Sequence, residues 1–339
     1  PSWNDTPAKA AIVSFVESVV DDSADTFVPV AERIAVFDND GCLWAEQPVY
    51  FQLLFALDRV RAMAADHPQW KDEEPFKSVL ADDMKAVMAS GKEGLLKLVA
   101  ASHSGMTPEQ FAADVADWLA SARHPRFYRP YDSLVFQPQL ELLDYLRDNG
   151  FKTFIVSGGG ADFVRVFAEE VYGIPPEQVV GTRLDATYEV RDGVPVVLKQ
   201  PDISLIDDKA GKPVGIHQHI GRRPIFAAGN SDGDFQMLEY TTAGDGPRFG
   251  MIVHHTDADR EWAYDRESHV GKLNDALAQA PDRGWLVVDM AKDWATVFPE
   301  LASANAGDAP ANTEGMAYIT GGTFIMGSDR PGARYDEQP

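Results

Sequence analysis

Residues 34-IAVFDNDGCLWAEQP-48 pass from an apolar run directly into a polar tip, where Asp38 and Asp40 are separated by one residue. The run 33-RIAVF-37 is short and rich in β-forming residues, which predicts a buried strand. Carboxylates that follow such a strand lie at its carboxyl end, where open α/β sheets bind their ligands. The stretch therefore predicts an α/β fold with a polar site at this strand end.

Strands and helices alternate along most of the remaining chain. A hairpin is predicted at 182–199, with Asp192 and Gly193 as its turn. The other predicted strands are 151–157, 224–229 and 249–255, and the predicted helices are 6–20, 138–150, 161–173, 233–240 and 271–280. Short apolar strands that alternate with helices predict a doubly wound, mostly parallel sheet with helices on both faces.

A helical insert interrupts this alternation. Between Tyr50 and about Ser121 the apolar residues follow a helical period, and no strand is predicted. The segment 107-TPEQFAADVADWLA-120 has a helix start signal, because its first four residues can form a capping box. We therefore expect an all-helical cap at residues 49–127, inserted into a core formed by residues 1–48 and 128–301.

The overall charge argues against two classes of partner. Lys and Arg total 30 while Asp and Glu total 53, which leaves a net charge of −23. Such a surface repels nucleic acid and anionic membrane lipid, so neither is expected to bind. A small anionic substrate is repelled as well, and its site therefore needs local positive charge or a metal cation.

Compartment and assembly are less constrained. The single cysteine, Cys42, excludes an intrachain disulfide and leaves the redox compartment open. No run approaches the roughly 18 apolar residues of a membrane-spanning helix. Because the chain starts at Pro1, either a leader has been removed or the sequence is a fragment. We expect a soluble protein of the cytoplasm or the periplasm, and its oligomeric state stays open.

Polar or flexible residues also follow two further predicted strands. Ser157 and 158-GGG-160 come after one strand, and 229-GNSDGD-234 comes after another. Because the carboxyl ends of parallel strands meet at one edge of a sheet, these residues are expected beside Asp38 and Asp40. Carboxylates, a hydroxyl, an amide and flexible glycine backbone then gather at a single site.

The order of these segments resembles the haloacid dehalogenase-like (HAD) superfamily. FDNDGCLW is similar to the first motif of that superfamily, FIVSGGG to the second and GNSDGD to the fourth. Lys212, in 211-GKPVGIHQHIG-221, is placed like the lysine of the third motif, and the neighbouring Lys209 is the alternative. The resemblance implies a Rossmann-like core and a phosphoserine-phosphatase-like enzyme that uses Mg²⁺ to hydrolyse a small phosphate monoester.

The resemblance also implies a role for each motif residue. Asp38 is the expected nucleophile, which forms an aspartyl-phosphate. Asp40 is the expected acid and base, because it can protonate the leaving alkoxide and then take a proton from water. The expected phosphate-binding groups are Ser157, Gly158 and Lys212.

One motif position departs from the family pattern. Mg²⁺ is expected between Asp38, the backbone carbonyl of Asp40 and Asn230, with Asp234 orienting its water shell. The family usually has an aspartate where Asn230 stands, so one negative charge is lost and the metal affinity should fall. Two alternatives stay open: a phosphotransferase or mutase on the same aspartyl-phosphate, and a degenerate binding or regulatory module.

The composition changes abruptly near residue 302. Residues 302–313 are small, polar and unpatterned, which is typical of a linker. The segment 315-GMAYITGGTFIMGSDR-330 resembles the start of the formylglycine-generating enzyme (sulfatase-modifying factor) domain. We therefore expect residues 314–339 to be the truncated start of such a domain. In the degenerate-module alternative, the HAD-like part is attached to this sulfatase-activating enzyme.

The remaining candidate side chains are expected to be structural. Cys42 has no evident histidine partner and is expected to fill space behind the nucleophile. Trp44 and Glu46 are close enough to the first strand to shape the mouth of the pocket. Two histidine pairs lack zinc-like spacing and are expected at the surface or in the core: His217 with His219, and His254 with His255.

Overall fold

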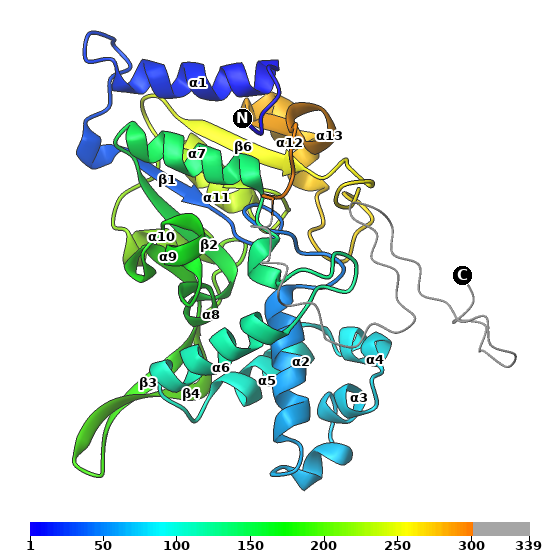
Figure 1. Ribbon diagram of the computed structural model, residues 1–339. Coiled ribbons are helices and arrows are strands. Elements are labelled where there is room, and N and C mark those ends of the chain that lie inside the picture. The colour runs from blue at the N-terminus through cyan, green and yellow to red at the C-terminus, as the bar shows by residue number, and fades with distance from the viewer. Residues whose placement is uncertain (301–339) are drawn as a thin grey trace, which may run out of the picture. The chain divides into compact units, whose positions relative to one another are not determined.

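The computed structural model of the chain describes residues 1–300 (Figure 1). By its contacts the chain divides into two units, Pro1–Pro299 and Glu300–Pro339. The predicted linker at 302–313 and the predicted start of a second domain at 314–339 lie outside the described residues. The sheet, the helical insert and the candidate site all belong to the first unit.

A seven-stranded sheet in the order β4-β3-β2-β1-β5-β6-β7 forms the centre of this unit. All neighbouring strands are parallel except β3 and β4, which form an antiparallel hairpin. The strands are β1 Ile34–Phe37, β2 Lys152–Gly160, β3 Val179–Arg191, β4 Val194–Leu205, β5 Phe226–Gly229, β6 Phe249–His254 and β7 Leu286–Asp289. This arrangement confirms the predicted α/β fold and adds β7, which the sequence analysis did not predict.

The residues of β1 alternate between the two faces of the sheet. Ala35 and Phe37 belong to the apolar cluster on one face, and Ile34 and Val36 belong to the cluster on the other. Full burial of a large apolar side chain stabilises the fold by about 1.5–3 kcal/mol. The central strand is therefore fixed from both faces, and its carboxyl end is where it can present polar groups.

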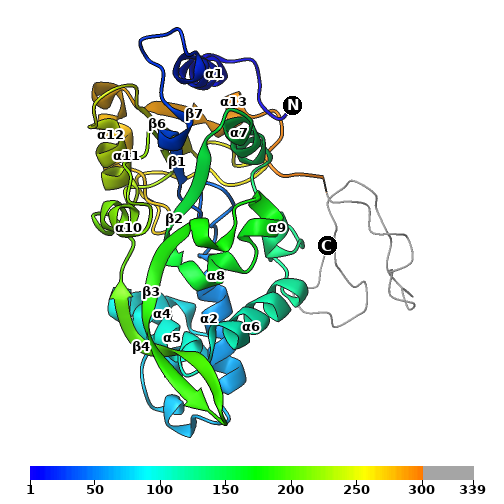
Figure 2. The same ribbon diagram turned by 90° about the vertical axis from the view of Figure 1, so that its left-hand side faces the viewer.

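Helices cover both faces of the sheet, as a doubly wound fold requires (Figure 2). One face is covered by α1 (Pro7–Val20) and α7 (Gln137–Asp148). The other is covered by α10 (Gly211–His219), α11 (Phe235–Thr242) and α12 (Asp275–Arg283). No helix within the described residues 1–300 is long and apolar enough to cross a membrane.

The insert between β1 and β2 is helical, as expected. Its helices are α2 Phe51–Met63, α3 Phe76–Leu80, α4 Met84–Ala89, α5 Gly91–His103 and α6 Pro108–Ser121. Leu57, Trp70 and Val79 are part of an apolar cluster within the insert, separate from the two clusters of the sheet. At the start of α6 the predicted capping box is present, with reciprocal bonds between Thr107 and Gln110.

The β3–β4 hairpin is longer than predicted. Its turn residues, Asp192 and Gly193, both have positive φ, 52° and 80°, which matches a two-residue hairpin turn with the twist of the strands. β4 also reaches the helical insert, because Gly105 N donates to Lys199 O (2.9 Å) and Lys199 N donates to Met106 O (3.0 Å). The hairpin thus joins the sheet to the insert.

The helix predicted at 161–173 is wrong in detail. The chain forms two short helices there, α8 (Ala161–Arg165) and α9 (Ala168–Tyr172). Phe167, with φ −120° and ψ −13°, leaves the helical conformation between them. Its ring is buried and stacks on Trp44 at 4.6 Å between ring centroids, so tertiary packing overrides the helical period of the sequence here.

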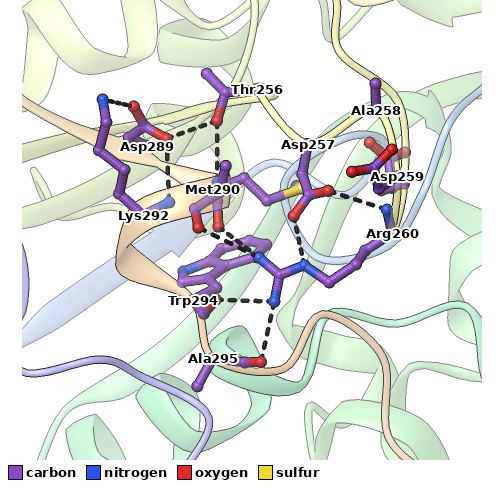
Figure 3. Close-up of polar contacts among 12 residues, drawn as sticks. Thr256, Asp257, Ala258, Asp259, Arg260, Asp289, Met290, Lys292, Trp294 and Ala295 are labelled. Carbon is purple, nitrogen blue, oxygen red and sulfur yellow. Dashed lines mark hydrogen bonds and ion pairs between the residues drawn. The ribbon is translucent and has the colours of Figure 1, made fainter.

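The loop that follows β6 is anchored to α13 (Met290–Asp293), as Figure 3 shows. The Thr256 hydroxyl donates to Asp289 Oδ1 (2.6 Å). The guanidinium of Arg260 pairs with Asp257 and donates to the carbonyls of Trp294 and Ala295 (2.9 Å each). These bonds fix residues 256–260, and a later residue of the same loop, Tyr264, contacts Glu46.

Candidate active site

A cavity of about 420 Å³ lies at the carboxyl ends of β1 and β2 and is also lined by the insert helices α2 and α5. Cavities of a few hundred cubic ångströms are typical of small-molecule sites. From the core, Asp38, Asp40, Gly158, Lys212 and Asp234 line the cavity. The structure therefore brings together five residues that the sequence analysis assigned to one site.

Lys212 lies at the centre of this group. Its ammonium group donates to Asp38 Oδ1 (2.7 Å), to Asp234 Oδ1 (2.6 Å) and to the carbonyl of Val156 (2.7 Å). Burial lowers the pKa of Lys212, but the carboxylates of Asp234 and Asp38 outweigh that effect and raise it. The side chain is only 2% exposed and stays charged, whereas the alternative, Lys209, is exposed at the surface.

The two aspartates after β1 differ in environment. Burial and the nearby carboxylate of Asp234 raise the pKa of Asp38, and Lys212 opposes that rise. Burial also raises the pKa of Asp40, to about 6, although a hydrogen bond from Trp44 Nε1 to Asp40 Oδ1 (2.8 Å) lowers it. A carboxyl group with a pKa near 6 can both give and take a proton at neutral pH.

The glycine segment after β2 forms another part of the wall. Gly158 and Gly159 line the cavity, but Ser157 is fully buried and is not among the lining residues. Ser157 Oγ accepts a hydrogen bond from Gly159 N (3.0 Å), so in this structure its hydroxyl holds the loop in shape. Gln52, which the sequence analysis missed, accepts from Gly160 N (2.7 Å) through Oε1.

The turn after β5 is held by Asp234. Its Oδ2 accepts from the backbone amides of Asn230 (2.9 Å) and Ser231 (3.0 Å), while its Oδ1 accepts from Lys212. Both carboxylate oxygens thus have partners within the protein. This geometry assigns Asp234 to bracing the turn and the lysine, and its predicted role toward a metal's water shell stays a proposal.

Asn230 has an unusual environment for a buried amide. Its Nδ2 donates to Glu46 Oε1 (2.8 Å), but its Oδ1 is buried and has no hydrogen-bond partner among the described residues. A buried acceptor without a partner costs about 1–3 kcal/mol. Asn230 Oδ1 can therefore accept a hydrogen bond from a ligand or coordinate a cation.

The donor types of the predicted magnesium set suit this ion, and Asn230 itself is buried and is not among the residues that line the cavity. Asp38 supplies a carboxylate, Asn230 a free amide oxygen and Asp40 a backbone carbonyl, and hard cations prefer oxygen ligands of these kinds. Within residues 1–300, no three His, Cys, Asp or Glu side chains gather with metal-binding geometry. The predicted set does not require such a cluster, because an amide and a backbone carbonyl complete it.

Glu46 and the turn that follows Asp40 are contacted by residues from distant parts of the sequence. Glu46 lines the cavity as expected, whereas Trp44 is buried and is not a lining residue. Tyr264, on the loop after β6, donates its hydroxyl to Glu46 Oε1 (2.7 Å). His255 is buried, with Nε2 2.7 Å from the carbonyl of Gly41, and braces the turn that follows Asp40. No sequence motif marked Tyr264 or His255 as neighbours of this turn.

The other residues of the first motif are structural. Cys42 is fully buried and burial raises the pKa of its thiol, which keeps it protonated and unsuited to nucleophilic attack. The carbonyl of Asn39 accepts from Leu43 N (2.8 Å), and its side-chain oxygen accepts from the Tyr172 hydroxyl (3.1 Å). Asn39 thus supports the turn between the two aspartates.

A curated protein is similar in sequence to part of this chain. A phosphorylcholine phosphatase of Pseudomonas aeruginosa is 26% identical over 239 residues, which are 60% of this chain and 65% of that protein. The chain thus spans about 65% of the length of this curated relative.

Two solved structures of proteins without known function are also similar. One, from Anaerococcus prevotii, has a TM-score of 0.48 and 16% identity over 76% of this chain and 87% of its own. The other, from Bordetella pertussis Tohama I, has a TM-score of 0.47 and 16% identity over 76% of this chain and 99% of its own.

The family match covers the motif residues. The family described as haloacid dehalogenase-like hydrolase matches residues 35–239, more than half of the chain, from the start of β1 into α11. The matched range contains both aspartates after β1, the glycine segment, Lys212 and the turn after β5. The chain therefore belongs to the haloacid dehalogenase-like hydrolase family.

Proposed function

We propose that this protein is a Mg²⁺-dependent phosphatase that hydrolyses a small phosphate monoester through an aspartyl-phosphate on Asp38. The observation that carries the proposal is the buried lysine bridge, in which Lys212 contacts both Asp38 and Asp234 at the cavity wall. Asp40, two residues beyond Asp38, has a pKa raised by burial to about 6. The group combines a nucleophile, a fixed cation and a proton carrier in one small cavity.

The first half of the reaction uses Asp38 and Asp40 together. A carboxylate oxygen of Asp38 attacks phosphorus, and the bond between phosphorus and the leaving alcohol oxygen breaks. Asp40 gives its proton to that oxygen, so the alcohol leaves neutral. Lys212 favours the carboxylate form of Asp38 and offsets the negative charge that develops around phosphorus. The products of this half are the free alcohol and a phosphoryl group on Asp38.

The second half returns the enzyme to its starting state. Asp40, now a carboxylate, takes a proton from a water molecule that attacks phosphorus, and the bond to Asp38 breaks. Mg²⁺, held by Asp38, Asn230 and the Asp40 carbonyl, would supply the positive charge that lowers repulsion between a carboxylate nucleophile and an anionic substrate. Asp40 favours a phosphatase over a dehalogenase, because a halide leaving group needs no proton.

The cavity lining favours an alcohol that carries no negative charge. The lining includes five acidic residues against a single basic residue, Lys212, which is already bound to Asp38 and Asp234. An alcohol with its own carboxylate finds no second cation there, whereas a neutral or cationic alcohol meets no such repulsion. The relative from Pseudomonas aeruginosa is a phosphorylcholine phosphatase. We therefore propose phosphorylcholine or a similar phosphorylated amino alcohol as the first substrate to test.

The experiment is a phosphate-release assay on the purified chain with Mg²⁺ or with EDTA. Substrates are phosphorylcholine, phosphoethanolamine, phosphoserine and p-nitrophenyl phosphate. We expect turnover that needs the metal, a preference for the amino-alcohol esters over phosphoserine, and a loss of roughly 10⁴-fold or more in Asp38→Asn. Asp148→Asn changes an exposed carboxylate of α7 that does not line the cavity and is the matched control.

The same assay tests the two alternatives. Absence of turnover with every divalent cation favours a degenerate module and contradicts the proposal. Phosphoryl transfer to an added alcohol that exceeds transfer to water favours a phosphotransferase on the same aspartate.

A further inference from the structure

The contact between Glu46 and Asn230 addresses the one motif position at which this chain departs from its family. We propose that Glu46 is a positioning residue: it holds the Asn230 amide in one orientation and leaves its oxygen free to bind the metal ion. The inference rests on the Mg²⁺ site of the proposed function. It assigns a specific task to a residue that lies outside the four motifs.

The orientation of the amide follows from hydrogen-bond chemistry. Glu46 Oε1 lies 2.8 Å from Asn230 Nδ2. A carboxylate oxygen can only accept hydrogen bonds, so the NH₂ group of Asn230 must face Glu46 and its oxygen must face away. That oxygen is buried and has no partner among residues 1–300. Without Glu46 nothing in this contact would distinguish the two ends of the amide.

The surrounding backbone is built to accommodate the pair. A Cβ atom on Gly41 would overlap both the Asn230 amide nitrogen and Glu46 Oε1, and a Cβ on Gly271 would overlap Glu46 Oε1. Both glycines also have positive φ, 75° and 64°. Tyr264 donates a second hydrogen bond to Glu46 Oε1 (2.7 Å). Three separate segments of the chain therefore converge on one carboxylate oxygen.

Glu46 acts behind the ligand set rather than in it. An aspartate at position 230 would present an oxygen from either side of its carboxylate, whereas Asn230 must turn its amide so that the oxygen is the donor atom. Partners in this position typically change metal affinity by 10–100-fold, because they fix the direction in which the ligand presents its donor atom. The hydrogen bond from Asn230 Nδ2 to Glu46 Oε1 fixes that direction here.

The test measures the dissociation constant of Mg²⁺ by isothermal titration calorimetry on the full chain. We expect Glu46→Ala to weaken Mg²⁺ binding by at least tenfold. Glu46→Gln keeps an oxygen that can accept from Asn230 and should weaken binding less than Glu46→Ala. Tyr264→Phe removes the other bond to the same carboxylate without touching Asn230, and it should change the constant by less than about threefold.

A second set of variants exchanges the amide and the carboxylate between residues 230 and 46. In Asn230→Asp alone, two carboxylates face each other, and we expect weak or absent gain in Mg²⁺ affinity. In Asn230→Asp combined with Glu46→Gln, the new glutamine amide can donate to the new aspartate, and Mg²⁺ should bind at least as tightly as to the parent. If Glu46→Ala does not fold, these two variants still test the inference.

The outcomes distinguish failure of the inference about Glu46 from failure of the proposed function. Melting temperatures in EDTA, measured for every variant, show whether a change lies in the fold or in metal binding. The inference is overturned if Glu46→Ala binds Mg²⁺ like the parent, if Tyr264→Phe loses as much affinity as Glu46→Ala, or if the double variant is no better than Asn230→Asp. If the parent itself neither binds Mg²⁺ nor responds to it in turnover, the metal site of the proposed function is what fails.

Discussion

The two walls of the cavity differ in almost every chemical respect. The wall from the core joins Asp38, Lys212 and Asp234 through short hydrogen bonds, so each charge has a fixed partner. The wall from the helical insert is mainly apolar and includes Leu53 of α2 and Leu95, Leu96 and Val99 of α5. We propose that the first wall transfers a phosphoryl group and that the second selects the alcohol to which this group is attached.

This difference shows which part of the site is constrained. Buried charges that share hydrogen bonds cannot be changed singly without leaving another charge unpaired. Apolar side chains along a cavity can be exchanged for others of similar size at modest cost. We therefore expect variants of the core wall to affect stability and turnover together, and variants of the insert wall to affect mainly the choice of substrate.

The most severe test of the core wall is Lys212→Met. It removes the cation between two carboxylates, and breaking a buried charge network of this kind costs about 3–5 kcal/mol of unfolding free energy. Turnover should also fall by at least roughly 100-fold, because the charge near phosphorus is lost. Urea unfolding at pH 7 and phosphate release are the measurements. Lys209→Met, at the exposed neighbouring lysine, should keep both properties, and equal stability of Lys212→Met and the parent would contradict the role of the bridge.

Asp207→Asn tests how the protonation of a buried carboxyl group affects the stability of the core. Asp207 is fully buried, neither of its carboxyl oxygens has a partner among the described residues, and burial raises its pKa to about 7 against the opposing charge of Lys212. In the unfolded chain an aspartate has a pKa of about 3.9, so the folded state binds the proton more tightly and stability falls as pH rises from about 4 to about 7.

Asp207→Asn removes this loss of stability at high pH, because asparagine has no proton to release. At about 1.4 kcal/mol per pKa unit, Asp207→Asn should raise the free energy of unfolding by about 4 kcal/mol at pH 8 and by little at pH 4. Urea unfolding at both pH values measures the difference, and the pH 4 value is the internal control. An equal gain at the two pH values would mean that the effect is not one of protonation.

A test of the insert wall is Leu96→Lys, which gives that wall the positive charge it lacks. We expect the ratio of kcat/KM for phosphoserine to that for phosphorylcholine to rise roughly tenfold, since the new cation attracts a carboxylate and repels a quaternary amine. The control is Leu96→Met, which keeps the wall apolar and should leave the ratio unchanged. If Leu96→Lys lowers both values equally, the insert wall does not select the alcohol.

The smallest effect is expected for Cys42→Thr, in the buried turn that follows Asp40. Gln139 Nε2 lies 3.9 Å from Cys42 Sγ and can donate to a hydroxyl in the same place. Turnover should stay within about twofold, and stability should fall by about 1 kcal/mol because a polar group enters a buried position. Thermal melting and phosphate release check this, and Cys42→Ala is the control. A large loss of turnover would give the cysteine a role that its burial argues against.

The core wall was largely predictable from the sequence, and the insert wall was not. An apolar strand followed at once by Asp38 and Asp40 is a local signal, and so is a glycine run after a strand. The order of four such signals along the chain was enough to predict that Lys212 and Asp234 lie at the same site. Strand β7 (Leu286–Asp289) was missed, although it is as long as β1 and β5, which were predicted.

Contacts between distant segments had no local signal. Glu46 and Asn230 are 184 residues apart, and Glu46 and Tyr264 are 218 residues apart. Gln52 follows the helical pattern of the insert, and nothing in that pattern distinguishes a side chain that reaches the glycine segment from one that faces water. Ser157 shows the reverse case, because its motif position predicts a phosphate ligand while the fold buries its hydroxyl beneath the loop.

The bonds between Lys199 and residues 105–106 bear on how substrates enter and leave. The helical insert is joined to the core by its two chain crossings near residues 49 and 127 and by the bond between Gln52 and Gly160, and the hairpin adds an attachment at residues 105–106. The insert therefore cannot swing away from the cavity about the two crossings alone. If the insert moves, either the hairpin moves with it or the two bonds between Lys199 and residues 105–106 open.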